Sequence, residues 1–378
     1  MRITKPRYVA VFAFLSLIAC SRTPPPAATT RTTAAAAGGA AEVKPQNAPA
    51  LKDAPVVKEG QVFGPGTTIG NLVVYPVSSR VQVDVGPLVA LDTALANGTA
   101  EVREVEGGGT VNTLVIENKG TVPVFVLAGT VVKGGNQDRQ IGQDFIIDGK
   151  QTTPVDAFCV EHGRWNGQRN GNVTSGKFRS TEVVATSKVR AAAQYKKSQG
   201  EVWSNVSSAN AANKKATASD TFVASVDDAT LGKQRADLAA KIDAALATVK
   251  PEGELVGVAY AIDGDVRGVR FFAHHNVFQI NRKKLLHGIA LESLTAKAEA
   301  EARGTSVVAK PAPAPAAVET FVKSVEAERV KEARDTSAAN VNEYKESAKA
   351  YGSKTMMKAS PKRAAPPATP VSSDFTAK

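Results

Sequence analysis

The chain has 378 residues, a formal net charge of +11 and 43% hydrophobic residues. Residues 1–65 contain 8 basic and 3 acidic side chains, and residues 304–378 contain 12 and 8, whereas residues 66–303 contain 27 and 25. The positive excess therefore lies at the two ends, so nucleic acid is not an expected partner of the central region, and two cysteines exclude a disulfide-dense scaffold.

The N-terminus has the layout of a secretory signal peptide. Arg2, Lys5 and Arg7 precede an apolar run over residues 8–19. About a dozen apolar residues are too few to cross a hydrocarbon core of ~30 Å as a helix. A basic start, a short apolar segment and small residues before a cleavage point are typical of exported proteins. Residues 1–19 are therefore predicted to direct export.

The end of this segment, Leu17-Ile18-Ala19-Cys20, resembles the lipobox of bacterial lipoproteins. The resemblance implies that Cys20 carries a diacylglyceryl group and becomes the first residue after cleavage. Ser21, where aspartate would favour the inner membrane, implies sorting to the outer membrane of a bacterial envelope. The alternative is an ordinary signal peptide that happens to end near a cysteine. Lipidation of Cys20 would leave Cys159 as the only thiol and exclude an internal disulfide.

Two low-complexity regions flank the predicted folded domain. Residues 20–65 are rich in Ala, Pro and Thr and lack the large apolar side chains that would offset the entropy of ordering, so they are expected to form a tether. Residues 304–378 are expected to be a basic tail with a helix over 319–334 and a disordered end. The globular domain is accordingly placed at residues 66–303.

The first half of this domain is rich in strand signals. Segments of β-branched and aromatic residues alternate with Gly and Asn punctuation, which is typical of strands. The strands are predicted over 72–75, 111–117, 122–132 and 145–147. One short helix is expected over residues 91–96, ended by Asn97-Gly98.

The second half has helical periodicity interrupted by one hairpin. Helices are predicted over 186–198 and 228–249 and from residue 281 onward, from apolar residues at helical spacing. The pair Asp263-Gly264 separates two apolar runs and supplies the positive φ angles of a tight hairpin turn. Because strands and helices do not alternate regularly, the sequence predicts an α+β fold.

The densest group of polar side chains follows a predicted strand, at residues 158–165. It contains Cys159, Glu161, His162, Arg164 and Trp165. These side chains could form a ligand site, and a thiolate near a histidine can act as a nucleophile. The alternative is a packed strand end, with Cys159 and Trp165 buried and Glu161 paired with Arg164.

A second polar loop covers residues 134–139 and contains Gln137 and Arg139. Its two glycines allow close approach of a ligand to the backbone, although a polar hairpin loop is the simpler interpretation. It lacks the Lys-Ser/Thr of a phosphate-binding loop and the spacing of a dinucleotide fingerprint. Four histidines, including His274-His275, show no metal-ligand spacing. No cofactor or metal is therefore expected.

Several motifs, taken in this order, resemble the ARG and Rhodanese-Phosphatase-superfamily-associated Protein domain. They lie at residues 71–76, 91–95, 116–118, 134–139, 159–165 and 256–259, together with the last predicted helix of the domain, so the resemblance covers roughly residues 67–297. The Cys-Val-Glu-x-Gly-Arg-Trp segment is its most specific part. The family is largely uncharacterised. Its association with ADP-ribosylglycohydrolases implies recognition of nucleotide-derived ligands.

The chain departs from the family pattern before the second loop. Thr130 and Val131 occupy the places where the family tends to have an acidic pair, and Asn136 replaces a lysine. If those groups perform chemistry in other members, this chain has lost them. The preferred interpretation is therefore a tethered, non-enzymatic module that binds a ligand or partner.

Two other interpretations of function stay open. One is a hydrolase or transferase that uses Cys159, Glu161 or His162, with Arg139 and Arg164 binding an anionic substrate. The other is a structural lipoprotein whose basic tail contacts an acidic envelope polymer. Since both polar segments follow strands, they are expected to lie side by side and to flank one pocket for a small anionic ligand. The simpler outcome is that the two loops brace each other without a cleft.

Overall fold

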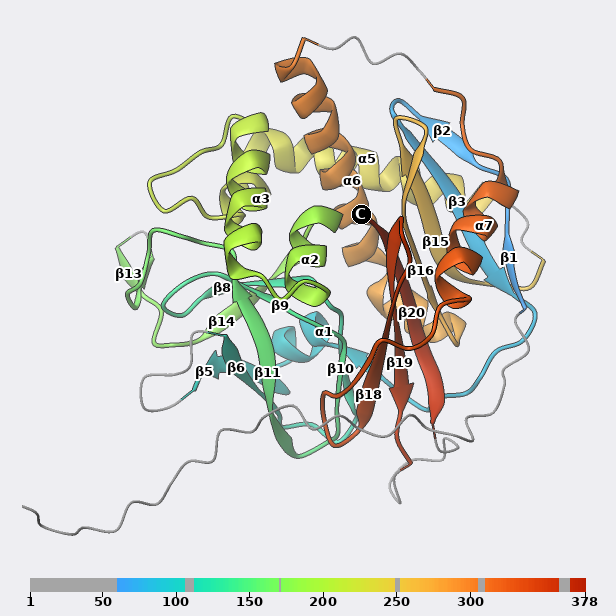
Figure 1. Ribbon diagram of the computed structural model, residues 1–378. Helices are drawn as coiled ribbons and strands as arrows, with labels where there is room; N and C mark the ends of the chain where they lie inside the picture. Colours follow the sequence, from blue (N-terminus) through green and yellow to red (C-terminus); the bar gives the residue numbers. More distant parts are fainter. Residues whose placement is uncertain (1–59, 106–111, 170, 249–251, 305–309, 360–367) are drawn as a thin grey trace, which may run out of the picture. The chain divides into compact units, whose positions relative to one another are not determined.

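The computed structural model describes residues 60–105, 112–169, 171–248, 252–304, 310–359 and 368–378 (Figure 1). The predicted signal peptide, Cys20 and nearly all of the predicted tether lie outside the described residues. Among the helices that are described, none is both long and apolar enough to cross a membrane.

The largest element is a nine-stranded antiparallel sheet that joins the two ends of the folded chain. Its order is β1-β3-β15-β16-β20-β19-β18-β17, with β2 paired to β3. The strands are β1 (Gln61–Phe63), β2 (Thr67–Ile69), β3 (Leu72–Ser79), β15 (Glu254–Ile262), β16 (Asp265–Phe272), β17 (Glu332–Asp335), β18 (Asn340–Glu346), β19 (Ala350–Met357) and β20 (Thr369–Ala377). The C-terminal strand β20 therefore lies inside the sheet, between β16 and β19.

The first half of the chain forms smaller sheets beside it. A six-stranded sheet has the order β14-β8-β9-β11-β6-β5, and a three-stranded one has the order β10-β7-β4. Their strands are β4 (Val89–Ala90), β5 (Ala100–Glu104), β6 (Thr113–Asn118), β7 (Val124–Val126), β8 (Thr130–Gly134), β9 (Arg139–Ile141), β10 (Phe145–Ile147), β11 (Gln151–Cys159) and β14 (Phe178–Val184). A short ribbon pairs β12 (Gln168–Arg169) with β13 (Asn172–Val173).

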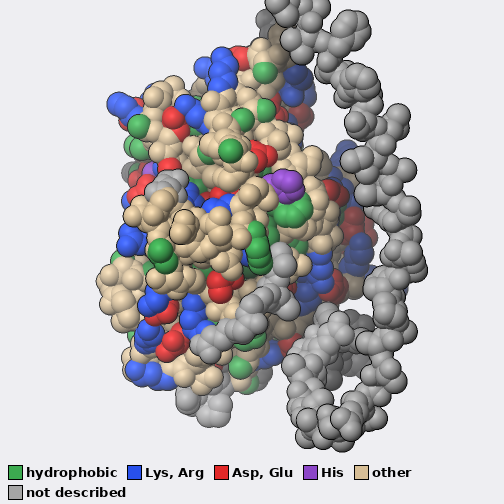
Figure 2. All heavy atoms as spheres, turned by 90° about the vertical axis from the view of Figure 1, so that its left-hand side faces the viewer, with side chains coloured by type: hydrophobic (Ala, Val, Ile, Leu, Met, Phe, Trp, Pro, Cys, Tyr) green, Lys and Arg blue, Asp and Glu red, His purple; other side chains and the backbone are tan. Residues whose placement is uncertain are grey.

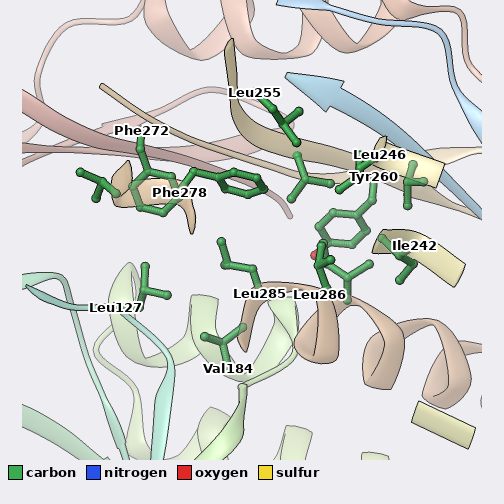
Figure 3. Close-up of a cluster of buried hydrophobic side chains, with 14 of the residues drawn as sticks. Leu127, Val184, Ile242, Leu246, Leu255, Tyr260, Phe272, Phe278, Leu285 and Leu286 are labelled. Carbon is green, nitrogen blue, oxygen red and sulfur yellow. The ribbon is translucent and has the colours of Figure 1, made fainter. Parts of the chain in front are cut away.

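The helices of the described residues are α1 (Leu91–Ala96), α2 (Ser187–Gln194), α3 (Gln199–Ala212), α4 (Val223–Asp227), α5 (Ala229–Thr248), α6 (His275–Ala302) and α7 (Pro315–Glu326). Successive side chains of a strand point to opposite faces, so β3 serves two cores. Leu72 and Val74 pack with α5 and α6 in one hydrophobic core, part of which is drawn in Figure 3, whereas Val73 and Tyr75 pack with α7. The large sheet is therefore covered by helices on both faces.

Two buried ion pairs connect the large sheet to the rest of the domain. Asp144, in the turn before β10, accepts hydrogen bonds from Arg270 of β16 at 2.6 Å. Asp374 of β20 pairs with Arg190 of α2. Burial opposes ionisation of Asp374, but Arg190 and Arg270 beside it hold the pKa of this carboxyl below its usual value. The contacts join segments far apart in sequence.

The α+β class predicted from sequence is confirmed, as are several local elements. The short helix covers residues 91–96 as expected, with Asn97 as its C-cap. The predicted hairpin forms between β15 and β16, and Asp263 and Gly264 have φ angles of 53° and 80°. Local sequence signals therefore specify these elements correctly.

The prediction that residues 304–378 are a basic tail outside the globular domain, with a disordered end, is wrong for the part that the structure describes. The tail supplies α7 and four strands of the large sheet, so the domain extends to the C-terminus. The helix expected over 319–334 is α7, which ends at Glu326 before β17 begins. Buried polar residues in these strands, such as Asn340 and Asn342, hide the apolar alternation that marks a strand.

Other boundaries also differ from the predictions. The segment 122–132 is two strands, β7 and β8, separated by a turn in which Gly129 has a φ of 82°. Helix α6 begins at His275 rather than 281, because the side chain of His274 caps it by accepting a hydrogen bond from the Asn276 amide. Neither α3 nor β14 was among the predicted elements.

Candidate functional site

The two polar segments singled out in the sequence lie side by side. Strands β9 and β11 are antiparallel, and Arg139 is the register partner of Cys159. The Val160 amide donates to the Asp138 carbonyl at 2.9 Å beyond the last ladder pair. The predicted proximity of residues 134–139 and 159–165 is therefore confirmed.

Arg139 is buried beneath this junction. Its Nη1 donates hydrogen bonds to Gln137 Oε1 and to Cys159 Sγ, both at 2.9 Å. The guanidinium is 1% exposed and lies 5.5 Å from the centre of the Trp165 ring. Burial raises the pKa of the Cys159 thiol, despite the nearby positive charge of Arg139. The thiol is therefore held in its neutral form, which is a poor nucleophile.

Glu161 and Arg164 form a brace between the two loops. Glu161 Oε2 accepts hydrogen bonds from the Asp138 amide at 2.9 Å and from Arg164 Nε at 3.0 Å. The Arg164 guanidinium also donates to the carbonyls of Gly134 at 3.0 Å and Gly135 at 2.8 Å. The pairing of Glu161 with Arg164 is the one expected for a packed strand end. Arg139 and Arg164, which were expected to bind an anionic ligand, thus both donate to acceptors within the protein.

Asp138 is the centre of this brace, although the sequence analysis did not select it. Its side chain is fully buried and accepts hydrogen bonds from the Gly134 amide at 3.0 Å and Thr221 Oγ1 at 2.7 Å. It also forms ion pairs with Arg164, at 3.5 Å, and with Arg169. Its position one residue before Arg139 in the Gly-Gly loop was the only sequence signal for this role.

The aromatic side chains above the brace are accessible. Trp165 is 52% exposed, so the expectation that it packs into the core is wrong. His162 is exposed and lies edge-on to Trp203 of α3, with ring centres 4.5 Å apart. One tryptophan of the chain therefore ends the segment 159–165, and the other contacts this segment through His162. Trp203 is 38 positions from Trp165 in sequence, and no local pattern connects them.

The family departures and the histidine pair have structural roles. Thr130 and Val131 are buried in β8, and the Asn136 amide donates to Glu104 Oε1 at 2.9 Å. His275 Nδ1 lies 2.7 Å from the Leu255 carbonyl oxygen. Within the described ranges, no group of three or more His, Cys, Asp or Glu side chains is arranged to hold a metal ion.

We expect Arg164→Met to destabilise the domain by about 3 kcal/mol, because it leaves Glu161 and Asp138 buried with fewer compensating donors. Arg80→Met is the matched control, since the Arg80–Glu252 pair is exposed and its loss should change stability by less than about 1 kcal/mol. Urea unfolding followed by circular dichroism measures both. Equal stability of the two variants would show that the brace contributes nothing.

Comparison with known proteins supplies a family and no functional relative. No curated protein and no solved structure matches the chain. Residues 60–363 match the ARG and Rhodanese-Phosphatase-superfamily-associated Protein domain. The matched region therefore extends past residue 303 into the C-terminal strands. Since the match spans most of the sequence, the chain belongs to this family.

Proposed function

We propose that the protein is a lipid-anchored envelope protein whose domain binds a small planar ligand at an aromatic surface. We define this aromatic surface as His162, Trp165 and Trp203. The anchor rests on the Leu17–Cys20 motif and Ser21, which favour lipidation and the outer membrane. The proposal for the ligand site rests on the aromatic side chains above the Glu161–Arg164 brace.

The exposure of Trp165 carries the proposal for the ligand site. An indole ring that is 52% exposed leaves apolar area in water, whereas Arg139 below it is buried and donates to Gln137 and Cys159. Indole faces stack well on planar groups such as nucleobases, with a gain of about 1–3 kcal/mol per base. A fixed cation behind the ring favours a ligand that also carries negative charge. Nucleotide-derived molecules have both properties.

Binding is favoured over catalysis at this surface by how its polar groups are used. Cys159 is a neutral buried thiol, because burial raises its pKa. Glu161 is 2% exposed and its carboxylate accepts from Asp138 and Arg164. A general base must reach a proton of the substrate within hydrogen-bond distance. The Glu161 carboxylate is already bonded within the protein and does not reach one. The surface therefore presents aromatic faces over a rigid support.

The charge distribution agrees with a small ligand rather than nucleic acid. Figure 2 shows basic and acidic side chains interspersed over the face that it presents, with no broad area of one sign. Nucleic-acid binding instead depends on several cations aligned with phosphates.

Trp165→Ala should weaken binding of the planar ligand by at least about tenfold, whereas Trp165→Phe should retain most of it, because an aromatic face remains. AMP, ADP-ribose and NAD are the probes, and titration calorimetry measures their affinities for the wild type and both variants. The proposal fails if none of the three binds the wild type, or if Trp165→Ala binds as tightly as the wild type.

Cys20→Ala should leave the protein unlipidated and unprocessed by the lipoprotein signal peptidase, because the thiol is the acceptor of the lipid. Membrane fractionation and intact-mass measurement of the protein expressed in a Gram-negative bacterium test this. Cys159→Ala is the control and should be lipidated normally. Membrane retention and normal mature mass of Cys20→Ala would contradict the anchor.

A further inference from the structure

A second candidate site lies away from the aromatic surface, in a cleft between α1, β14 and α6. The cleft has a volume of about 630 Å³ and is lined by side chains from all three elements. This volume is in the range of pockets that bind small molecules. Lys284 of α6 is among the lining residues, although only 6% of it is exposed. A buried lysine at the wall of an open cleft is uncommon.

The contacts of Lys284 fix the position of its amino nitrogen. Nζ lies 2.6 Å from Asp92 Oδ1 of α1 and 2.7 Å from Ser180 Oγ of β14. A neutral amine has two N–H groups and one lone pair. If both N–H groups are donated to Asp92 and Ser180, the lone pair is left for an electrophile. The strand next to Ser180 is irregular, with a register shift between Ser180 and Val184.

Burial and the charged neighbours of Lys284 act on its pKa in opposite directions. Burial lowers its pKa, although Asp92 and Glu182 oppose the change. Asp92 is the nearest of these acids, and its side chain is 40% exposed, so solvent screens its attraction. Lys283, the next residue on α6, is 73% exposed and pairs with Glu182 at 2.9 Å. The two neighbouring lysines therefore differ in burial and in partners.

Cations line the same cleft. Lys177 pairs with Glu101 at 3.4 Å, and Lys283 pairs with Glu182. Arg179 is exposed and forms no ion pair with any residue that the structure describes. A guanidinium without an internal partner suits a carboxylate, which it can bind through two parallel hydrogen bonds.

We propose that this cleft binds small carbonyl compounds that carry a carboxylate, and that Lys284 holds them as a reversible imine. The Nζ lone pair forms a bond to the carbonyl carbon, and the proton released by nitrogen passes through Asp92 to the carbonyl oxygen, which gives a carbinolamine. The second N–H proton leaves nitrogen through Asp92 and reaches the hydroxyl through Ser180, so one water leaves as the neutral C=N bond forms. Hydrolysis reverses the step. Arg179 would hold the carboxylate.

Reductive trapping of the full-length protein tests the proposal. Glyoxylate is the probe, sodium cyanoborohydride reduces any imine, and peptide mass spectrometry measures the modification rate of each lysine. We expect Lys284 to be modified at least about tenfold faster than Lys283, because the cleft would hold the bound carbonyl compound next to its amino group. A purely structural Lys284, which only ties α1 and β14 to α6, would react no faster than the surface lysines, and that result overturns the proposal.

Variants identify which groups matter. Lys284→Met should abolish the fast phase, and Lys283→Met is the matched control that should keep it. Ser180→Ala should slow trapping at Lys284 by about tenfold while the protein remains folded by circular dichroism. An unchanged trapping rate would overturn the role given to Ser180. The mapping in wild-type protein decides the main claim even if Lys284→Met does not fold. The lysine mapping is also independent of ligand binding at Trp165.

Discussion

The buried carboxylate of Asp144 is the contact on which the arrangement of the domain depends. Its side chain accepts from the Ala128 amide at 2.7 Å, Arg270 at 2.6 Å, Thr355 Oγ1 at 2.9 Å and Ser372 Oγ at 2.6 Å. These donors come from the turn before β8 and from β16, β19 and β20. Isolating such a charge from water costs several kcal/mol unless its acceptor sites are filled. Donors from β19 and β20 complete that set, so the C-terminal strands contribute to the stability of the first half of the chain.

The same constraint explains which parts of the fold the sequence predicted. The turn at Asp263-Gly264 and the helix over 91–96 depend on neighbours in sequence, and both were predicted correctly. The strands after residue 331 depend on partners far away. Asn340 Nδ2 donates to the Asp144 carbonyl at 3.3 Å, and Asn342 Nδ2 to the same oxygen at 2.9 Å. An asparagine in a basic, alanine-rich segment predicts a loop, because the local sequence does not show its distant hydrogen-bond acceptor.

The candidate sites follow the same rule. The proximity of Arg139 to Cys159 could be predicted, because both follow apolar strand segments and strand ends gather at a sheet edge. The pairing of the side chains could not be predicted, because Arg164 donates to carbonyls about thirty positions earlier in the chain. Lys284 lies in a helix that was predicted only from the spacing of its apolar residues, and its contact with Asp92 spans 192 positions. Functional interpretation therefore needed the tertiary structure at both sites.

The most direct test of this account is the stability of Asp144→Asn, measured by urea unfolding. Asparagine keeps the shape of the side chain but leaves Arg270 buried beside a neutral amide. We expect a loss of about 3–5 kcal/mol in the free energy of unfolding. The matched control is Asp335→Asn, whose side chain is 51% exposed and pairs with Lys358 at 2.6 Å, with an expected change below about 1 kcal/mol. A loss no larger than that of the control would contradict the central role of Asp144.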